Sequence, residues 1–536
     1  MSWDYIVVGA GSAGCAVAAR LSEDATQRVL LLDAGARDWS AFIHVPAGII
    51  FGRNRFDWSY PGDPDPSRGG MDDIWSAGNA FGGSSAINGM MYVRGNPLDF
   101  DSWAQAGCAG WDYKSVLPFF KRMETWEDGE SAWRGGEGPV HVVRDPVRHP
   151  LAAAFIQAAS QSGFPINDDY NGRDQDGAAV VQANQKRGLR HTSARAYLGW
   201  GKRRSNLQVI HRARVDKILF DGNRAIGVRY TRGGRVETAQ CRHEVILSAG
   251  ALISPKLLML SGIGDADHLA QFDVETVCDS PGVGRNLQEH AVTALSFEAS
   301  VRTLNTEKVF SLRAFRHAYN YLVHHRGPLA ACVGAAQLFC KSDAGEPRPD
   351  LQIIFVPMGY DFVETKTTVE LRMHPKPHMT VAITALHTKN RGSIRLRSAD
   401  PEDTPRIQFE LLGTDDVIEK LAAGCRIVRT ISGKPALQQF IVEESLPGTA
   451  LATDDEKGWE EYLRSASYRG DHPCGSCKMG SKDDSLAVVD PELRVIGVEG
   501  LRVADASVMP TVVSGNTNAA VMMIGERAAD LILKSR

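Results

Sequence analysis

Short apolar runs separated by glycine-rich and polar segments recur along the chain and predict a mixed α/β protein. Residues 5–8 form the first run, and it is followed by glycines and by a small-residue segment with helical character at residues 15–21. A second apolar run, residues 29–32, ends directly at Asp33. This succession of strand, glycine turn, helix and strand is typical of the first unit of a Rossmann-like domain.

Two further groups of apolar segments predict two different sheets. Runs that would extend the sheet of the first domain lie at residues 207–210, 215–218, 225–228 and 245–247. Alternating segments that predict a mainly antiparallel second sheet lie around residues 351–356, 379–386 and 393–396. Because 536 residues exceed what one hydrophobic core usually organises, we expect two domains.

The first glycine turn has the spacing of a dinucleotide-binding site. Gly9 permits the tight turn, Gly11 lets the backbone approach a pyrophosphate, and Gly14 allows the helix to pack closely on the strand. The N-terminus of the helix presents unpaired N–H groups to the anion. Asp33 stands where this motif binds the adenosine ribose hydroxyls, and its charge would repel a 2′-phosphate. These features do not distinguish FAD from NAD.

A second glycine cluster, GGSSAIN at residues 82–88, has two interpretations. Its backbone N–H groups could contact the pyrophosphate or the flavin of a bound dinucleotide. It could equally form a surface turn, since serine and glycine are common in any loop.

Composition and charge narrow the class of protein. Hydrophobic residues make up 43% of the chain and charged residues 23%, the balance of an ordinary globular protein. Lys and Arg number 60 against 64 Asp and Glu, so a net charge of -4 supplies no electrostatic footprint for nucleic acid or an anionic membrane. We find neither a secretory leader nor the roughly 18 consecutive apolar residues of a membrane-spanning helix. We therefore expect a soluble, cytoplasmic protein.

The segment DHPCGSCKMG, residues 471–480, leaves three interpretations of His472: metal ligand, partner of a redox disulfide, or catalytic base. A structural zinc needs about four ligands, and Cys474 and Cys477 have no second pair or suitably spaced histidines, so we expect no metal site. A redox pair would stand at a helix N-terminus of a small domain, which this segment does not suggest. Nine scattered cysteines favour reduced thiols over a disulfide framework.

Five blocks of sequence together resemble the glucose-methanol-choline (GMC) oxidoreductase family, and the chain looks most similar to its bacterial choline dehydrogenase-like members. The blocks are GNAFGGSSAINGMMYVRGNPLDFD (78–101), GALISPKLLMLSGIG (250–264), PGVGRNLQEH (281–290), HPCGSCKMG (472–480) and LRVADASVMPTVVSGNTNAAVMMIGERAADLI (501–532). They occur in the family's order, and the likeness runs from Asp4 to about Leu533.

This resemblance implies an FAD-dependent enzyme whose two domains alternate along the chain. The FAD-binding domain would comprise residues 1–155, 200–295 and 465–536, and the substrate domain residues 156–199 and 296–464. Some family members attach their flavin covalently to a histidine, but the matching position here is Ile87. We therefore predict FAD that is bound without a covalent link.

The resemblance also implies which residues act on the substrate and hold the cofactor. His472 would take the hydroxyl proton, Asn516 would hold the developing oxyanion, and flavin N5 would accept the hydride. Taken alone, His472 could be a core histidine, and Asn516 could cap a helix beginning near Asn518. The residues expected to contact FAD are Gly9, Gly11, Ser12, Ala13, Gly14, Asp33, Ala34, Gly82, Gly83, Ser84, Asn88, Gly89, Val215, Asp505, Ala506, Asn516 and Thr517.

The substrate and the electron acceptor are less defined. Apolar segments at residues 41–50 and 329–338 are expected to form pocket walls, which favours an uncharged aliphatic or aromatic primary alcohol, with sugar-like and quaternary-amine alcohols as alternatives. Oxygen or a quinone could reoxidise the cofactor, and a dehydrogenase is favoured. A hydroxynitrile lyase that uses no net redox chemistry and a non-catalytic flavin-binding module are the other hypotheses. Asp471 could bind a polar group, raise the pKa of His472, or simply lie in a solvated loop.

Overall fold

The computed structural model describes residues 2–199, 204–307, 312–364 and 369–535, and their first sheet assembles strands from distant parts of the chain. Its strands run in the order β11, β2, β1, β14, β13, β12, and β27 pairs with β14. Their bounds are β1 (Ser2–Val8), β2 (Val29–Leu32), β11 (Leu207–Ile210), β12 (Ala213–Asp221), β13 (Arg224–Arg232), β14 (Arg235–Leu247) and β27 (Leu501–Val503).

The parallel centre of this sheet explains the uninterrupted apolar runs of the sequence. Strands β1, β2, β11, β14 and β27 pair in parallel, whereas β12, β13 and β14 form an antiparallel meander. All four residues of β2 are buried, as expected for a strand covered on both faces. The predicted strands at residues 207–210, 215–218, 225–228 and 245–247 all belong to this sheet, so this part of the prediction is confirmed.

The second sheet is antiparallel throughout. Its strands run in the order β25, β17, β22, β19, β18, β7, and β26 pairs with β17. Their bounds are β7 (Gly177–Val180), β17 (Ala291–Ala299), β18 (Ala336–Cys340), β19 (Leu351–Val356), β22 (His378–Ala385), β25 (Ile441–Leu446) and β26 (Tyr468–Arg469). Helix α10 (Asp415–Ser432) packs on β22, β17 and β19, and α6 (Pro150–Gln161) packs on β18 and β7. The predicted α/β fold with a mainly antiparallel second sheet is confirmed, while the five-segment division remains a prediction.

One predicted strand of the second sheet lies elsewhere. Strand β23 (Ser393–Arg395) pairs with β24 (Arg406–Gln408) in a separate two-stranded ladder, so its assignment to the large sheet is wrong. The backbone N–H of Ile394 donates instead to the carbonyl oxygen of Gly284, which holds this strand against the PGVGRNLQEH block. Alternation of apolar and polar residues indicates a half-buried strand but does not name its partner.

Short elements and helices complete the chain. The remaining strands are β3 (Tyr60–Pro61), β4 (Ile74–Trp75), β5 (Glu124–Trp126), β6 (Val140–Arg144), β8 (Gln182–Ala183), β9 (Gln185–Lys186), β10 (Leu189–Arg190), β15 (Ile263–Gly264), β16 (Cys278–Asp279), β20 (Tyr360–Glu364) and β21 (Val369–Met373). The other α-helices are α1 (Ser12–Leu21), α2 (Ala41–His44), α3 (Ile49–Gly52), α4 (Pro97–Gln105), α5 (Tyr113–Met123), α7 (Ser254–Leu260), α8 (Ala266–Ala270), α9 (Leu312–His324), α11 (Pro435–Gln438), α12 (Glu456–Ala466) and α13 (Asn518–Lys534). Among the described residues, no helix is long and apolar enough to cross a membrane.

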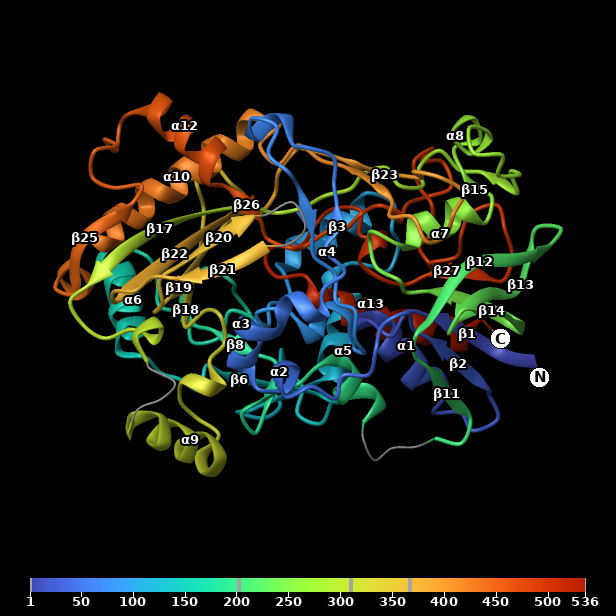
Figure 1. The fold of residues 1–536 in the computed structure, drawn as a ribbon, viewed down its shortest axis with the longest axis horizontal. Helices are drawn as coiled ribbons and strands as arrows, with labels where there is room; N and C mark the ends of the chain where they lie inside the picture. The colour runs from blue at the N-terminus through green and yellow to red at the C-terminus, as the bar shows by residue number, and fades with distance from the viewer. Residues whose placement is uncertain (1, 200–203, 308–311, 365–368, 536) are drawn as a thin grey trace.

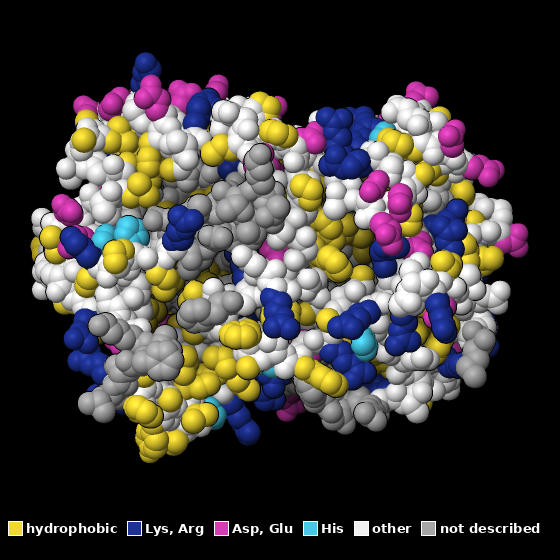
Figure 2. Space-filling model, in the orientation of Figure 1, with side chains coloured by type: hydrophobic (Ala, Val, Ile, Leu, Met, Phe, Trp, Pro, Cys, Tyr) yellow, Lys and Arg dark blue, Asp and Glu magenta, His cyan; other side chains and the backbone are white. Residues whose placement is uncertain are grey.

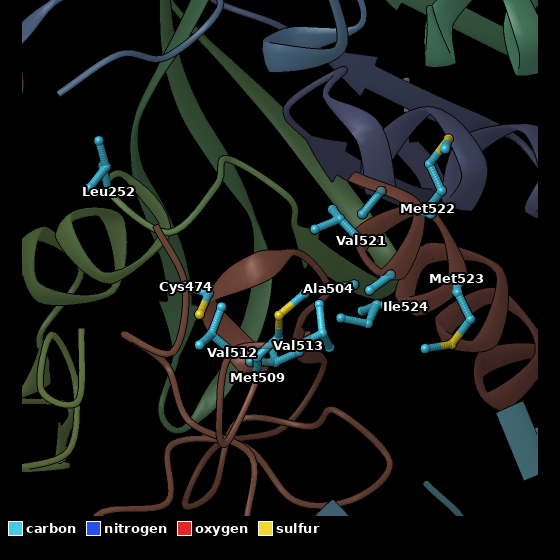
Figure 3. Packing of buried hydrophobic residues seen from close by; sticks show 14 of the residues in the cluster. Leu252, Cys474, Ala504, Met509, Val512, Val513, Val521, Met522, Met523 and Ile524 are labelled. Carbon is cyan, nitrogen blue, oxygen red and sulfur yellow. The ribbon is translucent and has the colours of Figure 1, made fainter. Parts of the chain in front are cut away.

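The two sheets lie at opposite ends of the molecule, with α13 between them (Figure 1). Helix α13 packs along α1, and a Cβ on Gly525 would stand 2.5 Å from the Ala13 carbonyl oxygen, so only glycine allows this approach. Met522, Met523 and Ile524 of α13 belong to the hydrophobic core, and Figure 3 shows Ile524 beside Val513. One side of the C-terminal helix therefore packs on α1, next to the glycine turn, while Ile524 contacts the core around Val513.

Candidate active site

A cavity of about 1320 Å³ lies between the two sheets and takes residues from both. One end is formed by the turn between β1 and α1, the end of β2, and the start of β12. The other end is formed by β19, β22 and the loop that carries His472. We call the part of the cavity beside the glycine turn the nucleotide end and the part beside His472 the reaction end.

The glycine turn shapes the nucleotide end. Gly9 has a φ of +102°, and a Cβ there would lie 2.3 Å from the Ser248 carbonyl oxygen. A Cβ on Gly14 would lie 1.9 Å from the Gly9 carbonyl oxygen, and one on Gly83 would lie 2.8 Å from the Gly11 Cα. Helix α1 begins after Gly11 without a side-chain cap, so its first N–H groups remain available to an anion in the cavity. These residues fit the pyrophosphate of a dinucleotide.

Asp33 completes this end of the cavity. Its Oδ2 accepts a hydrogen bond from the Ala10 N–H at 2.6 Å, and its Oδ1 accepts one from the Gly35 N–H at 2.7 Å. Burial raises the pKa of Asp33 to about 6, while these two hydrogen bonds act in the opposite direction. The carboxylate is thus fixed beside the glycine turn, as ribose recognition requires.

Most residues predicted to contact the cofactor do line the cavity. They are Gly9, Gly11, Ser12, Ala13, Asp33, Ala34, Gly83, Ser84, Asn88, Gly89, Val215, Asp505, Ala506, Asn516 and Thr517. Gly14 and Gly82 are not among the lining residues. Gly14 instead packs against Gly9. Gly82 adopts a φ of +93° at the start of the GGSSAIN segment. The roles of all these residues toward FAD remain predictions.

At the reaction end, one buried carboxyl group, that of Glu289, binds the backbone N–H groups of both His472 and His290. The His472 N–H donates to Oε1 and Oε2 of Glu289 at 2.7 and 2.9 Å, and the His290 N–H donates to Glu289 Oε1 at 2.8 Å. Burial, reinforced by the charge of Asp471, raises the pKa of Glu289 well above its usual range. One side chain therefore links the PGVGRNLQEH block to the loop of His472.

The hydrogen bonds of the His472 ring define which nitrogen carries the proton. Gln352 Nε2 donates to Asn516 Oδ1 at 3.2 Å, so the Asn516 amide nitrogen faces His472 Nε2 at 3.0 Å. Because an amide nitrogen can only donate, His472 Nε2 accepts and the ring proton lies on Nδ1. That Nδ1–H donates to His290 Nδ1 at 2.9 Å. His472 therefore presents an unprotonated Nε2 beside Asn516 at the cavity.

Electrostatics keep both histidines neutral. Burial lowers the pKa of His472 to about 4, although the Asp471 charge raises it. Burial and the proximity of His472 lower the pKa of His290 well below its usual value. A neutral imidazole at physiological pH has the free electron pair that a proton acceptor needs.

Asp471 does not behave as a simple solvated loop residue. It adopts a φ of +60° and forms an ion pair with Arg53, which also donates to Ser76 Oγ at 2.8 Å. The side chain of Asp471 is 35% exposed, so the pair lies at the edge of the cavity. Its charge acts on the pKa of His472 in the direction the sequence suggested, but burial outweighs it.

Two simpler interpretations of this segment are wrong. Helix α13 has Thr517 at its N-cap position and no side-chain cap, so Asn516 does not cap it but reaches His472 instead. His472 is not an ordinary core histidine, because its ring lines the cavity. Cys474 and Cys477 are fully buried, and Cys474 packs beside Val512 and Met509 (Figure 3). All nine cysteines are free, and the described residues contain no group of three or more potential metal ligands.

Sequence reasoning missed four residues at this site. Glu289 and His290 end the PGVGRNLQEH block, whose resemblance to the family implies no role for them. Gln352 is the one polar residue in the apolar strand LQIIFV, and this exception is the signal that could have identified it. Arg190 is 1% exposed, and its Nη1 donates to the carbonyl oxygen and Oδ1 of Asn88 at 2.6 and 2.8 Å. Its Nη2 has no hydrogen-bond partner among the described residues and belongs to a side chain that lines the cavity.

Comparison with known proteins decides the family. Residues 3–292 and 388–525 match the GMC oxidoreductase family. The chain belongs to the GMC oxidoreductase family. It is 42% identical to an oxygen-dependent choline dehydrogenase from Sinorhizobium fredii over 99% of this chain and 96% of that protein, and 40% identical to one from Brucella ovis with the same coverage. The chain is therefore an FAD-type oxidoreductase that acts on CH–OH donors.

Solved structures agree with this family assignment. The pyridoxine 4-oxidase from Mesorbium loti superposes with a TM-score of 0.88 at 28% identity, covering 99% of both chains. A formate oxidase from Aspergillus oryzae superposes with a TM-score of 0.90 at 25% identity, covering 100% of this chain and 98% of that one. The GMC fold predicted from the sequence blocks is thus confirmed.

The substrate end of this GMC cavity is largely apolar. Its walls include Ile49 and Ile50 of α3, Leu329 and Val333 of the segment after α9, and Ile354 and Val356 of β19. Both predicted wall segments, residues 41–50 and 329–338, contribute lining residues. Ile87 lines the cavity as well, and its hydrocarbon side chain offers no atom for a covalent bond to a flavin.

Proposed function

We propose that this GMC oxidoreductase oxidises a primary alcohol with an apolar body to the aldehyde, using FAD and His472 as the base. The observation that carries the proposal is the unprotonated Nε2 of His472 beside the Asn516 amide in the cavity. A hydroxyl group placed there would meet a proton acceptor and a hydrogen-bond donor together.

Proton removal is the step that the chain's own residues would perform. His472 Nε2 would accept the hydroxyl proton, and the Nδ1–H bond to His290 would hold the ring while it becomes charged. The Asn516 Nδ2 would donate to the substrate oxygen as its negative charge grows, because Gln352 fixes the direction of the amide. Bound FAD supplies the acceptor for the hydride that leaves the α-carbon.

We propose that FAD binds without a covalent link. The glycine turn around Gly9 and Gly14 and the N-terminus of α1 would hold the pyrophosphate, and Asp33 would bind the ribose hydroxyls. Ile87 supports a dissociable cofactor, since a side chain of carbon and hydrogen cannot form the bond that histidine forms elsewhere in the family.

The cavity supports an aliphatic or aromatic primary alcohol as the first candidate substrate, because its reaction end is lined by branched apolar side chains. An amino alcohol with a cationic head, such as choline, is the second candidate. It is favoured by Glu307, an acidic residue that lines the cavity, and by the similarity of the chain to two oxygen-dependent choline dehydrogenases. Glu307 accepts a hydrogen bond from His317 Nε2 at 3.0 Å, so part of its charge is already engaged.

A panel of alcohols added to the purified protein without oxygen tests this proposal. We expect aliphatic or benzylic primary alcohols to bleach the yellow flavin absorbance, and choline to do so with a higher KM. Glu307→Gln should raise the KM for choline by about tenfold, which is the effect of losing one ion pair of moderate strength. The KM for an uncharged alcohol should not change. A flavin that dithionite bleaches but no alcohol does would overturn the proposal and favour lyase chemistry.

Readmission of air to the bleached protein then separates the two acceptor classes. We propose a dehydrogenase, so colour should return slowly in air and quickly when a soluble quinone is added. Rapid return in air alone would identify an oxidase.

A further inference from the structure

Helix α9 carries a solvent-exposed apolar face. Phe315 is 78% exposed, Tyr319 59%, Leu322 73% and Val323 52%. The last three positions lie four, seven and eight residues after Phe315, so the four side chains share one side of the helix. Figure 2 shows the resulting group of hydrophobic side chains at the tip of the projection that α9 forms in Figure 1. We call these four residues the α9 patch.

The opposite side of α9 fixes this orientation. Tyr321 is buried, and its hydroxyl group donates to the Gly188 carbonyl oxygen at 3.1 Å. His317 is paired with Glu307 on the chain that precedes the helix. The α9 patch therefore faces outward because the polar contacts of the helix are made on its inner side.

The charge around the α9 patch is positive, unlike that of the whole chain. Between Glu307 and Asp343 the sequence contains no acidic residue, whereas Arg313, Arg316 and Arg326 all lie there and are exposed. Neither Arg313 nor Arg316 forms an ion pair with any residue in the described ranges. The net charge of -4, which disfavours membrane binding when taken over the chain, hides this local basic region.

The helix also stands at the rim of the cavity. Leu304 and Glu307, just before α9, line the cavity, and so do Leu329 and Val333, just after it. Val333 is itself 39% exposed. A surface that covered the α9 patch would thus lie next to the substrate end.

We propose that α9 docks the protein on a lipid surface that carries anionic headgroups. An apolar stripe flanked by arginines on a projecting helix matches the acyl and headgroup layers of such a surface, with the apolar side chains inserted and the guanidinium groups at the phosphates. A protruding helix also reaches a flat surface without steric hindrance from the body of the protein (Figure 1). Docking would bring the rim of the cavity to the bilayer. This inference stands apart from the proposed reaction, since it concerns binding alone.

Vesicle sedimentation with the intact flavoprotein tests the docking. We expect the protein to sediment with vesicles of phosphatidylcholine and phosphatidylglycerol, and much less with phosphatidylcholine alone. Phe315→Ser combined with Leu322→Ser should lower the bound fraction about tenfold or more, since two inserted side chains are lost. Arg313→Gln combined with Arg316→Gln should lower it about tenfold at low salt and abolish the preference for the anionic lipid.

The β13–β14 hairpin provides the matched control, because it also exposes an apolar residue next to an arginine at the far end of the molecule (Figure 1). Val236, 65% exposed, changed to Ser together with Arg235→Gln should leave sedimentation unchanged. Circular dichroism and flavin content should be the same in all variants, since every altered side chain is exposed. Wild-type protein that does not sediment with either vesicle overturns the proposal. Light scattering could also show a dimer that dissociates when Phe315→Ser is combined with Leu322→Ser. That result would overturn the proposal too, because a second copy of the chain would then cover the α9 patch.

Discussion

The two ring nitrogens of His472 have different tasks, and residues from three distant segments assign them. Gln352 orients the Asn516 amide, Asn516 faces Nε2, and His290 accepts the proton of Nδ1. Motif resemblance predicts His472 and Asn516, because both stand in recognisable blocks. It cannot predict the His290 contact, since 182 residues separate the two rings and only the folded chain brings them together.

The neutral state of His472 has a measurable effect on stability. Its pKa is lowered to about 4 in the folded protein, against about 6.5 unfolded, so below pH 6.5 the unfolded state binds a proton that the folded state does not. Wild-type stability should therefore fall relative to His472→Gln by about 3 kcal/mol between pH 7 and pH 4. Urea unfolding of both proteins at several pH values measures this difference. A difference in unfolding free energy that stays constant with pH would contradict the neutral state of the ring.

Gln352 should act through the direction of the Asn516 amide. Gln352→Met keeps the volume but removes the donor to Asn516 Oδ1, so the amide can turn and kcat should fall about tenfold. Gln175→Met is the control, because Gln175 is a buried glutamine that donates to the Ser514 carbonyl oxygen and does not contact Asn516. Both variants should lose some thermal stability, but only Gln352→Met should lower kcat. An equal loss of kcat in both would mean that Gln352 is merely structural.

At the scale of elements, the local pattern of apolar residues predicts where strands lie but not which strands pair. The apolar runs identified β1, β2 and the strands of the central segment because a parallel strand buried on both faces needs an uninterrupted apolar sequence. Strand β23 shows the limit, since its alternation of apolar and polar residues predicts a strand, but its partner is β24 rather than a strand of the large sheet. Pairing depends on contacts far apart in the chain, which periodicity does not encode.

The turn between β1 and α1 allows a test of the nucleotide end. Gly14→Ala would place a Cβ 1.9 Å from the Gly9 carbonyl oxygen, so the turn must distort and FAD affinity should fall at least about tenfold. Gly433→Ala is the control, because Gly433 has a φ of -78° and its Cβ would meet the nearest atom at an ordinary 3.5 Å. Fluorescence titration of the apoprotein with FAD measures both affinities. Unchanged FAD affinity in Gly14→Ala would contradict the role of the β1–α1 turn in binding the cofactor.

At the scale of the whole molecule, the cavity is the feature that the sequence could not supply in detail. Chain length and the family resemblance predict two domains, and the apolar segments predict an apolar pocket. The shared wall of α3, β19 and the segment after α9 depends on how the two sheets face each other. The α9 patch likewise escaped prediction, because net charge averages over a chain whose basic residues are locally concentrated.

A cofactor held between two sheets should stabilise both of them. If FAD binds as proposed, acid precipitation should release the yellow colour into the supernatant, because the Ile87 side chain offers no atom for a covalent bond to the flavin. Saturation of the apoprotein with FAD at about a thousand times its Kd should add about 4 kcal/mol of stability and raise Tm by several degrees. Differential scanning fluorimetry with and without FAD measures the shift. Colour that stays with the precipitate would indicate a covalent link.

The central claim is that His472 accepts the substrate proton in an FAD-dependent alcohol oxidation, and its most direct test is the anaerobic single-turnover rate of flavin bleaching. We expect a saturating primary alcohol to bleach wild-type protein rapidly, and His472→Gln to bleach about a hundred to ten thousand times more slowly at equal flavin content. Glutamine can still donate and accept hydrogen bonds but cannot take a proton at neutral pH. Equal bleaching rates in the two proteins would show that another group is the base.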